Sequence, residues 1–391
     1  MKLTTIKSIV AAALCAVGFA AWSEPQQIGD SSTTWELTQG CTVLTIGGSG
    51  PMPDFYDPSE APWYWETTGG EESQEAYRVI AEVKIGSGVT SIGSCAFGNH
   101  ESLESVTIPS SVESIGSMAF CNCFLLKSVT IPQSVKTIGG YAFTGCQSLE
   151  SVTIPSGVTS IEDNTFAACS SLSSVTIPSG VKSIGAHAFE SCSLSSVTIP
   201  SSVESIGGNA FYNCRKLGSV TIPSGVTSIG QYAFNYCIKL SSVTVEATTP
   251  PTAGSNIFGS GIGMSADLEI TVPKASTAAY RAADGWSTYK DYINPDPVTI
   301  DAVAVVTPWD STKGAISVDY SLAGLDAGGW YKVAFDITAG GKMAGVTNAA
   351  AQLVEGAQAQ KVIDTVTLFG KETVAKDAKV KVSLIAVKPA K

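Results

Sequence analysis

The sequence is poor in the residues on which polar catalysis and nucleic-acid binding depend. Its 391 residues include only two histidines, His100 and His187, and charged residues make up only 15% of the chain. Acidic residues outnumber basic ones, and the formal net charge is −11. A nonspecific surface for nucleic acid or anionic lipid is therefore not expected, whereas a basic partner would be tolerated. With 44% hydrophobic residues, the chain has ample material for a packed core.

Long apolar runs are missing after residue 21. Residues 1–23 carry Lys2 and Lys7, then an apolar run from Ile9 to Ala21, and then small residues suited to cleavage. This pattern predicts a secretory signal peptide, and the run is too short to favour a permanent membrane span. Cys15 suggests lipidation, but the large Leu14 before it disfavours that alternative. We expect an exported protein, secreted or held at the cell surface.

A motif of about 23 residues, by contrast, recurs from Val83 to Val245. It reads Leu103-x-x-Val106-x-Ile108-Pro109-x-x-Val112-x-x-Ile115-x-x-x-Ala119-Phe120-x-x-Cys123. The step between copies is 23 residues, except for 22 between Ile177 and Ile199. Self-similarity in this range, with a Leu-x-x-Val-x-Ile core, predicts a leucine-rich-repeat solenoid.

Each position of the motif has an expected role. Val106 and Ile108 are two residues apart, so on a strand they share one face and point inward. Pro109 lacks a backbone donor and suits the strand end, and Gly116 and its equivalents are expected to ease the bend. We predict a right-handed, β-rich solenoid of about eight coils with a parallel sheet, spanning roughly 35 to 40 Å at 4.8 Å per coil. Little regular helix is expected before residue 275.

The repeat resembles the BspA-like leucine-rich repeats of bacterial surface proteins. The similarity covers roughly residues 33–295, and the run from Val220 to Cys237 follows the family pattern almost verbatim. The resemblance implies a surface or secreted recognition protein, since several members act in adhesion, and it implies no catalytic residue. The position that usually holds a ladder asparagine carries serine or glycine here, namely Ser111, Ser134, Gly157, Gly180, Ser202 and Gly225.

Stacked coils need covers at both ends. We predict an N-terminal cap at residues 24–80, with a hairpin of Trp35–Leu37 and Val43–Ile46 and a plug of Pro62 and Trp63. The solenoid follows at 81–246. A C-terminal cap is predicted at 247–295, with a strand at 268–272, a short helix at 276–283, and Trp286, Tyr289 and Ile293 closing the apolar end.

The last part of the chain, residues 296–391, has no repeat. Five alternating or β-branched runs are separated by Gly, Asp and Asn turns, which predicts a small immunoglobulin-like β-sandwich. The runs are 298–306, 315–322, 331–337, 362–369 and 380–387. Such a module is most often a spacer or a second contact surface.

Six cysteines occupy the same position of successive coils and are called here the cysteine column: Cys123, Cys146, Cys169, Cys192, Cys214 and Cys237. A straight file of thiols is a poor zinc site, because zinc ligands converge from different directions. Disulfides remain possible in an exported protein, but we favour buried, reduced thiols that pack as small apolar groups. Cys41, Cys95 and Cys121 lie off the column and are better candidates for a bridge or a reactive thiol. No metal or cofactor is expected.

Candidate binding residues lie where the copies differ from one another. Aromatic side chains accumulate in the late coils beside basic residues, and these types are enriched at binding hot spots. The candidates are Tyr212, Tyr232, Tyr236, Arg215 and Lys216. Trp63, Tyr64 and Trp65 offer an alternative sugar-binding surface, and the repeated outward Ser-x-Thr pairs most simply form a solvated sheet face.

No catalytic set can be assembled from the repeat. His100 and His187 lie nearly four coils apart, roughly 19 Å at 4.8 Å per coil, so they cannot act together, and each is expected at the surface. Glu113 and Glu204 share one position but lie four coils apart, too far for paired carboxylates. We therefore predict a non-enzymatic recognition or adhesion protein that binds an extracellular protein or glycan. A carbohydrate-binding accessory protein is one alternative, and a cryptic hydrolase is another.

Overall fold

The computed structural model describes residues 25–29, 31–38, 42–64 and 80–294, and the strand backbones between 297 and 387. The predicted signal peptide, Cys41 and Trp65 lie outside these residues. Contacts divide the chain into two compact units, Met1–Ile293 and Asn294–Lys391.

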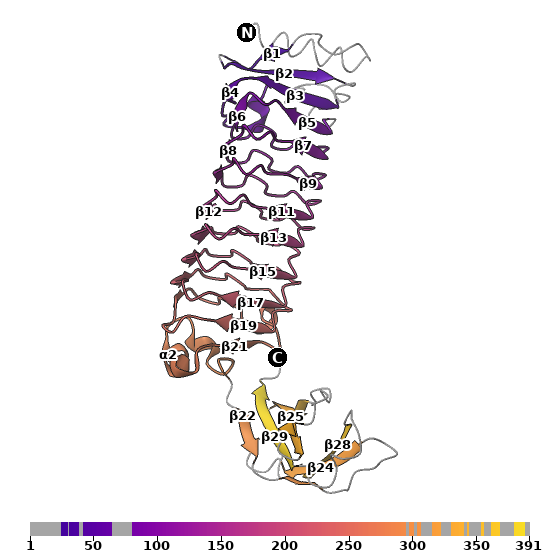
Figure 1. Cartoon of the computed structure of the whole chain (residues 1–391), viewed down its shortest axis with the longest axis vertical. Coiled ribbons are helices and arrows are strands. Elements are labelled where there is room, and N and C mark those ends of the chain that lie inside the picture. Colours follow the sequence, from indigo (N-terminus) through magenta and orange to yellow (C-terminus); the bar gives the residue numbers. More distant parts are fainter. Residues whose placement is uncertain are drawn as a thin grey trace. The chain divides into compact units, whose positions relative to one another are not determined.

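The first unit is a solenoid whose coils stack one on the next (Figure 1). Its Val-Thr-Ile segments form in-register parallel strands, so that Val106 pairs with Val129 and Val220 with Val243. Inward Val and Ile alternate with exposed Ser and Thr, as the period-two pattern predicted. The strands are β5 (Glu82–Ile85), β7 (Ser105–Thr107), β9 (Ser128–Val129), β11 (Ser151–Thr153), β13 (Ser174–Thr176), β15 (Ser196–Thr198), β17 (Ser219–Ile222), β19 (Ser242–Val245) and β21 (Glu269–Thr271).

A second row of parallel strands comes from the Ser-Ile segments, which we did not expect to form a sheet. They pair in register, for example Ile115 with Ile138 and Ile184 with Ile206. The isoleucines are buried, so this row closes another side of the core. Its strands are β4 (Gly50–Pro51), β6 (Val89–Ile92), β8 (Ser114–Ile115), β10 (Thr137–Ile138), β12 (Ser160–Ile161), β14 (Ser183–Ile184), β16 (Ser205–Ile206), β18 (Ser228–Ile229) and β20 (Thr252–Ala253).

A third row of backbone hydrogen bonds joins the turns around each Ala-Phe pair. In each of seven coils, three alternate N–H groups donate to carbonyls of the next coil, as Met118, Phe120 and Asn122 do to residues 140, 142 and 144. The donors at both ends of this triplet have positive φ, close to 57° for Met118 and Asn122 alike. All these N–H groups therefore point toward the C-terminal neighbour. We call the outer surface of this row the turn face.

Side chains from all three rows fill one continuous core. The motif phenylalanines stack on one another with ring centroids 5.1 to 5.6 Å apart, from Phe97 to Phe234. They are fully buried, as are the motif Leu and Ala positions. We call this stack the phenylalanine column. Only neighbouring coils can bury these rings, so each coil depends on the next for its core.

The motif glycines serve a purpose different from the predicted one. Gly116 and Gly139 have no positive φ, but a Cβ at either would lie 2.4 to 2.5 Å from a backbone nitrogen of the preceding coil. The glycine is needed because two coils approach closely there, and not because the chain bends. Glu162 is the exception, because it carries a side chain at the same position of its coil.

The N-terminal end of the solenoid is covered by the predicted hairpin. Strands β2 (Thr33–Thr38) and β3 (Val43–Gly48) pair antiparallel, β1 (Gln26–Gln27) adds to β2, and β3 continues the first sheet onto β5. Trp63 is fully buried, stacks on Phe97 at 5.6 Å, and donates its indole N–H to the Ala96 carbonyl at 2.8 Å. The predicted plug is therefore confirmed for Trp63.

The C-terminal end is closed by β21, the helix α2 (Thr277–Ala282) and a short 3-10 turn, Ser287–Tyr289. Phe258 extends the phenylalanine column and meets Trp286 and Tyr289 edge-on. Trp286, Tyr289 and Ile293 are buried, as predicted, and so is Tyr280. Trp286 Nε1 and the Tyr280 hydroxyl donate to carbonyls of the preceding loop, each at 2.8 Å, which satisfies polar groups at the buried end.

Among the described residues the first α-helix is α2, and Ser114 to Cys123 and its copies form strands and turns, as predicted.

The second unit consists of antiparallel strands in two sheets. One sheet runs β22 (Pro297–Ile300), β29 (Lys379–Val387), β25 (Trp330–Ala339) and β26 (Lys342–Met343), with β27 (Leu353–Glu355) also on β25. The other runs β23 (Val303–Val305), β24 (Ala315–Ser321) and β28 (Lys361–Thr367). Each predicted run contains a strand; the immunoglobulin-like type of the fold stays a prediction.

Candidate functional site

The turn face presents the side chains that differ most from coil to coil. Its first positive-φ position holds a different set of chemical groups along the stack: Cys95, Met118, Tyr141, Asn164, His187, Asn209 and Tyr232. The second such position holds Asn99, Asn122, Gly145, Ala168, Ser191, Asn213 and Tyr236. Asn, His and Gly tolerate this backbone region, whereas Met and Tyr are unusual there. The shared backbone thus carries a varied set of side chains.

The structure brings two of the predicted binding residues into contact on this face. The rings of Tyr212 and Tyr236 meet edge to face, with centroids 5.4 Å apart. Tyr236 is held by its second-position backbone, whose N–H bonds to the Asn235 side chain at 2.8 Å and to the Gly263 carbonyl at 2.8 Å. Both tyrosines are half-buried, so part of each ring is exposed to solvent and can contact a ligand. Tyr232 lies on the same face at the first position of its coil.

The predicted basic residues lie at the exposed edge of the same coil. Arg215 donates from Nε to Asn213 Oδ1 at 2.7 Å, which fixes the guanidinium beside the second-position column. Lys216 is exposed and, like Lys239 one coil later, lies two residues after a cysteine of the column. The late coils therefore combine aromatic rings with positive charge.

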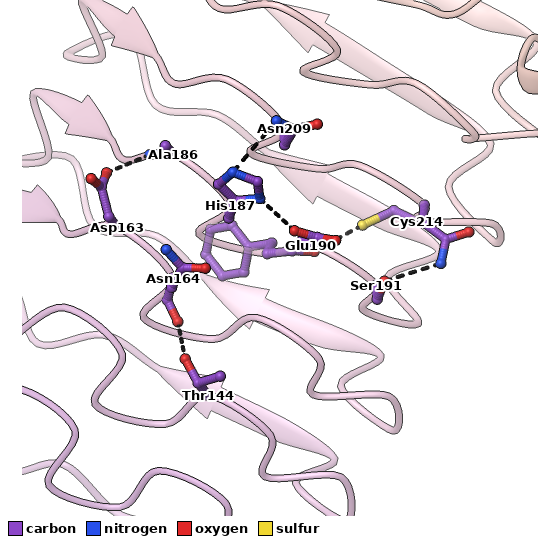
Figure 2. Close-up of polar contacts among 11 residues, drawn as sticks. Thr144, Asp163, Asn164, Ala186, His187, Glu190, Ser191, Asn209 and Cys214 are labelled. Atoms are coloured by element: carbon purple, nitrogen blue, oxygen red, sulfur yellow. Dashed lines mark hydrogen bonds and ion pairs between the residues drawn. The ribbon is translucent and has the colours of Figure 1, made fainter. Parts of the chain in front are cut away.

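One coil before Tyr212 lies a polar cluster around His187 that the sequence analysis did not predict (Figure 2). His187 Nδ1 contacts Glu190 Oε2 at 2.5 Å, and His187 Nε2 lies 3.5 Å from the Asn209 amide. Asn213 Nδ2 donates to Ser191 Oγ at 3.0 Å, which links this coil to the tyrosine coil. His187 is 40% exposed, as its predicted surface position requires. The sequence could have indicated His187 as a candidate, because it occupies the same motif position as Tyr232.

The two sheet faces are more uniform. The first shows rows of exposed Ser and Thr, and the second carries ion pairs between adjacent coils. Lys136 Nζ lies 2.7 Å from Glu113, and Lys182 Nζ lies 2.9 Å from Glu204. Lys136 lowers the pKa of the Glu113 carboxyl through its hydrogen bond and charge. Such exposed pairs add little stability.

The cysteine column is buried, as predicted, and all six thiols are free. Each Sγ donates to the phenylalanine carbonyl of the preceding coil at 3.2 Å, so the thiols also serve as hydrogen-bond donors between coils. Burial raises the pKa of these thiols, to about 12 for Cys169 and Cys214. Thiolate formation is thus disfavoured, and we expect the column to be unreactive in the folded chain.

The asparagine-ladder position also finds inter-coil partners where it holds serine. Ser111, Ser134 and Ser202 each donate from Oγ to a valine carbonyl of the preceding coil at 2.6 Å. These hydroxyls supply the bonds that the absent asparagines would make.

The prediction of a surface position for His100 is wrong. His100 is fully buried and stands 23 residues before Cys123, at the cysteine position of the first coil. Its Nδ1 lies 3.0 Å from the Gly98 carbonyl, and its ring packs against Phe97 and Tyr64. Burial lowers the pKa of His100 to about 4, so the ring is neutral at physiological pH.

Among the described residues, no three His, Cys, Asp or Glu side chains converge as metal ligands. In the same part of the chain, no helix is long and apolar enough to cross a membrane.

Stacked 23-residue coils with these parallel rows define a leucine-rich-repeat solenoid. Residues 75–194 and 136–265 match the family described as BspA type leucine rich repeat region, in 6 copies. The repeat region of the chain belongs to this BspA-type family, as its motif indicated. No curated protein matches it.

Solved structures with similar repeats come from several bacteria. A leucine rich cell surface protein from Faecalibacterium prausnitzii is 28% identical, over 64% of this chain and 76% of its own, with a TM-score of 0.40. A leucine-rich repeat protein from Eubacterium ventriosum is 25% identical over 62% and 76%, with a TM-score of 0.36. The leucine rich repeat protein of T. pallidum is 22% identical over 66% and 95%, also with a TM-score of 0.36.

Proposed function

We propose that this chain is an exported, non-enzymatic recognition protein whose turn face binds an extracellular protein or glycan. One observation carries the proposal: the turn face keeps one backbone in seven coils while its side chains change from coil to coil. Solenoids use such extended surfaces for binding, because side chains there can vary without disturbing the core.

We place the centre of binding on the late coils, at Tyr212, Tyr232, Tyr236, Arg215 and Lys216. The edge-to-face pair Tyr212 and Tyr236 offers large aromatic surfaces, and Arg215 is held by Asn213, the residue after Tyr212. Aromatic and arginine side chains in such settings carry most of the free energy of many interfaces. The ring faces would also stack on sugars, which supports a glycan partner as the second candidate.

The test is an array of extracellular matrix proteins and glycans, probed with the full chain and with a variant carrying Tyr212→Ala and Tyr236→Ala. We expect the double variant to lose at least about tenfold in affinity for any ligand found, because removing hot-spot rings costs more than about 1.4 kcal/mol. Tyr141→Ala is the matched control, since Tyr141 lies on the same face in an early coil.

Equal binding by the double variant and wild type would move the site away from the late coils. Loss of binding in the Tyr141→Ala control alone would place it on the early turn face. Turnover of a glycan or peptide on the array, without stable binding, would overturn the recognition proposal in favour of a hydrolase.

A further inference from the structure

Two sulfur atoms meet at the N-terminal end of the turn face, and a further cysteine lies in the same turn as one of them. Cys95 Sγ lies 4.0 Å from Met118 Sδ and 3.9 Å from the carbonyl oxygen of Tyr56. Cys121 belongs to the same turn as Met118, because its N–H donates to the Met118 carbonyl at 3.2 Å. Cys95 and Cys121 are both free thiols, and Cys121 is partly exposed.

The repeat does not require sulfur at any of these positions. Cys95 and Met118 occupy the first positive-φ position, which holds Tyr141, Asn164 and His187 in the next three coils. Both have φ near 57°, a region that bulky side chains rarely adopt. The Cys121 position holds Thr144, Ala167, Glu190 and Tyr212 in later coils. The positive φ is shared by all seven coils, so the neighbouring sulfurs, and not the backbone, are the local feature of the first two coils.

Negative charge surrounds this group. The loop that contains Asp54, Asp57 and Glu60 packs on the first coil: Asp54 Oδ1 accepts the Ser94 N–H at 2.7 Å, and Phe55 donates to the Ser94 carbonyl at 3.0 Å. Burial, and then the charges of Asp57, Glu60 and Asp54, raise the pKa of the Cys95 thiol. The pKa of the Cys121 thiol is raised by its own burial and then by Cys95. This environment opposes a bare thiolate and favours a bound cation.

We propose that Cys95, Met118 and Cys121 bind a soft monovalent metal ion of the Cu(I) class. Thiolate and thioether sulfur are the ligands that select Cu(I). With a metal–sulfur distance of about 2.3 Å, as in zinc thiolates, two ligands of a trigonal site lie about 4 Å apart, which matches the observed Cys95–Met118 separation of 4.0 Å. On binding, each cysteine thiol releases its proton to solvent as its metal–sulfur bond forms, and no electron is transferred.

The test uses the reduced full chain under anaerobic conditions, titrated with Cu(I) in competition with a chromophoric Cu(I) chelator. We expect one strong site per chain. Cys95→Ser, Cys121→Ser and Met118→Leu should each lower the affinity roughly 10- to 100-fold or more, since even ligand-supporting residues carry that much. Met264→Leu removes a partly buried thioether elsewhere and should leave the affinity unchanged.

The pH dependence separates metal binding at this thiol pair from general adsorption. Because two thiol protons are displaced, the apparent affinity should rise about 100-fold per pH unit while both thiols are protonated. In Cys121→Ser it should rise only about tenfold. Melting curves of every variant without metal check that the fold is retained.

Equal Cu(I) affinity in wild type and in all three sulfur variants would overturn the proposal. So would a mass loss of two hydrogens that peptide mapping assigns to a Cys95–Cys121 disulfide in the native chain, because that result would make the pair a structural bridge.

Discussion

At the scale of single residues, the first coil departs from the repeat at a buried position. Cys123 and its successors donate a thiol to the phenylalanine carbonyl of the coil before, whereas His100 stands at the same position beneath them. A histidine ring is larger than a thiol, and it contacts Tyr64 of the N-terminal cover. His100 thus joins the repeat to the segment that covers it, and it brings a titratable group into the core.

This placement predicts a pH dependence of stability. The folded-state pKa of His100 is lowered from 6.5 to about 4, so between these values the unfolded chain binds more protons than the folded one. The stabilising effect of a neutral His100 is therefore fully present above about pH 6.5 and is lost as the pH falls toward 4, by about 1.4 kcal/mol per pH unit. Denaturant unfolding of wild type and His100→Cys between pH 4 and 7 measures it.

His100→Cys is the matched variant because it restores the cysteine found at this position in the later coils. Its free energy of unfolding should change less over this pH range than that of wild type. As the pH rises from 4 to 6.5, the wild type should therefore gain stability relative to the variant. Parallel pH curves would show that His100 does not titrate as its burial requires.

At the scale of structural elements, the phenylalanine column is the feature that every coil shares. Phe166 lies between Phe143 and Phe189, with centroid distances of 5.5 and 5.6 Å, and is fully buried. Phe166→Ala should lower the free energy of unfolding by about 3 to 5 kcal/mol, through lost burial and the cavity that remains. Ser174→Ala, on the exposed sheet face, should change it by less than about 0.5 kcal/mol. A comparable small change in both variants would mean that the column carries little of the stability.

The elements that could be predicted from the sequence are those with a strong side-chain pattern. The Val106 and Ile108 pair alternates with exposed Ser and Thr, and this period revealed the first sheet. The row of two-residue Ser-Ile strands was missed because two residues are too short to show a period. The turn-face row was missed because its bonds join residues about 22 apart, and positive φ is suggested only where Asn or Gly occupies the position.

For the candidate site too, the sequence pattern selected some residues correctly, but their contacts and burial came only from the structure. Tyr212 and Tyr236 were selected because aromatic residues accumulate late in the chain, and the structure places their rings in contact. His100 was assigned to the surface, whereas the structure buries it fully. Counting 23 residues back from Cys123 would have placed it in the core.

At the scale of the whole solenoid, each coil contacts mainly its two neighbours, so the number of coils is not critical. Deleting residues 147–169 removes one complete step of 23 residues from Gln147 to Cys169. We expect this variant to keep a cooperative thermal transition and unchanged far-ultraviolet circular dichroism per residue, since Cys146 would precede Ser170 just as Cys169 does. Deleting residues 147–157 instead removes about half a step and misaligns every row.

The half-step deletion should abolish cooperative unfolding or lower the melting temperature far more than the full-step deletion. Similar melting temperatures for the two variants would show that register between the rows contributes little to the fold.

The common direction of the N–H groups on the turn face has an electrostatic consequence. In an ordinary sheet, peptide dipoles alternate and nearly cancel. On the turn face, three peptide groups in each of seven coils point their N–H toward the C-terminal neighbour, so their dipoles add along the stack. The negative end lies at the first coil, the reverse of an α-helix, whose N-terminus is positive. Phe55 and Trp63 donate to carbonyls at that end, and the Cys95 thiol lies beside it, where the summed dipole attracts a cation.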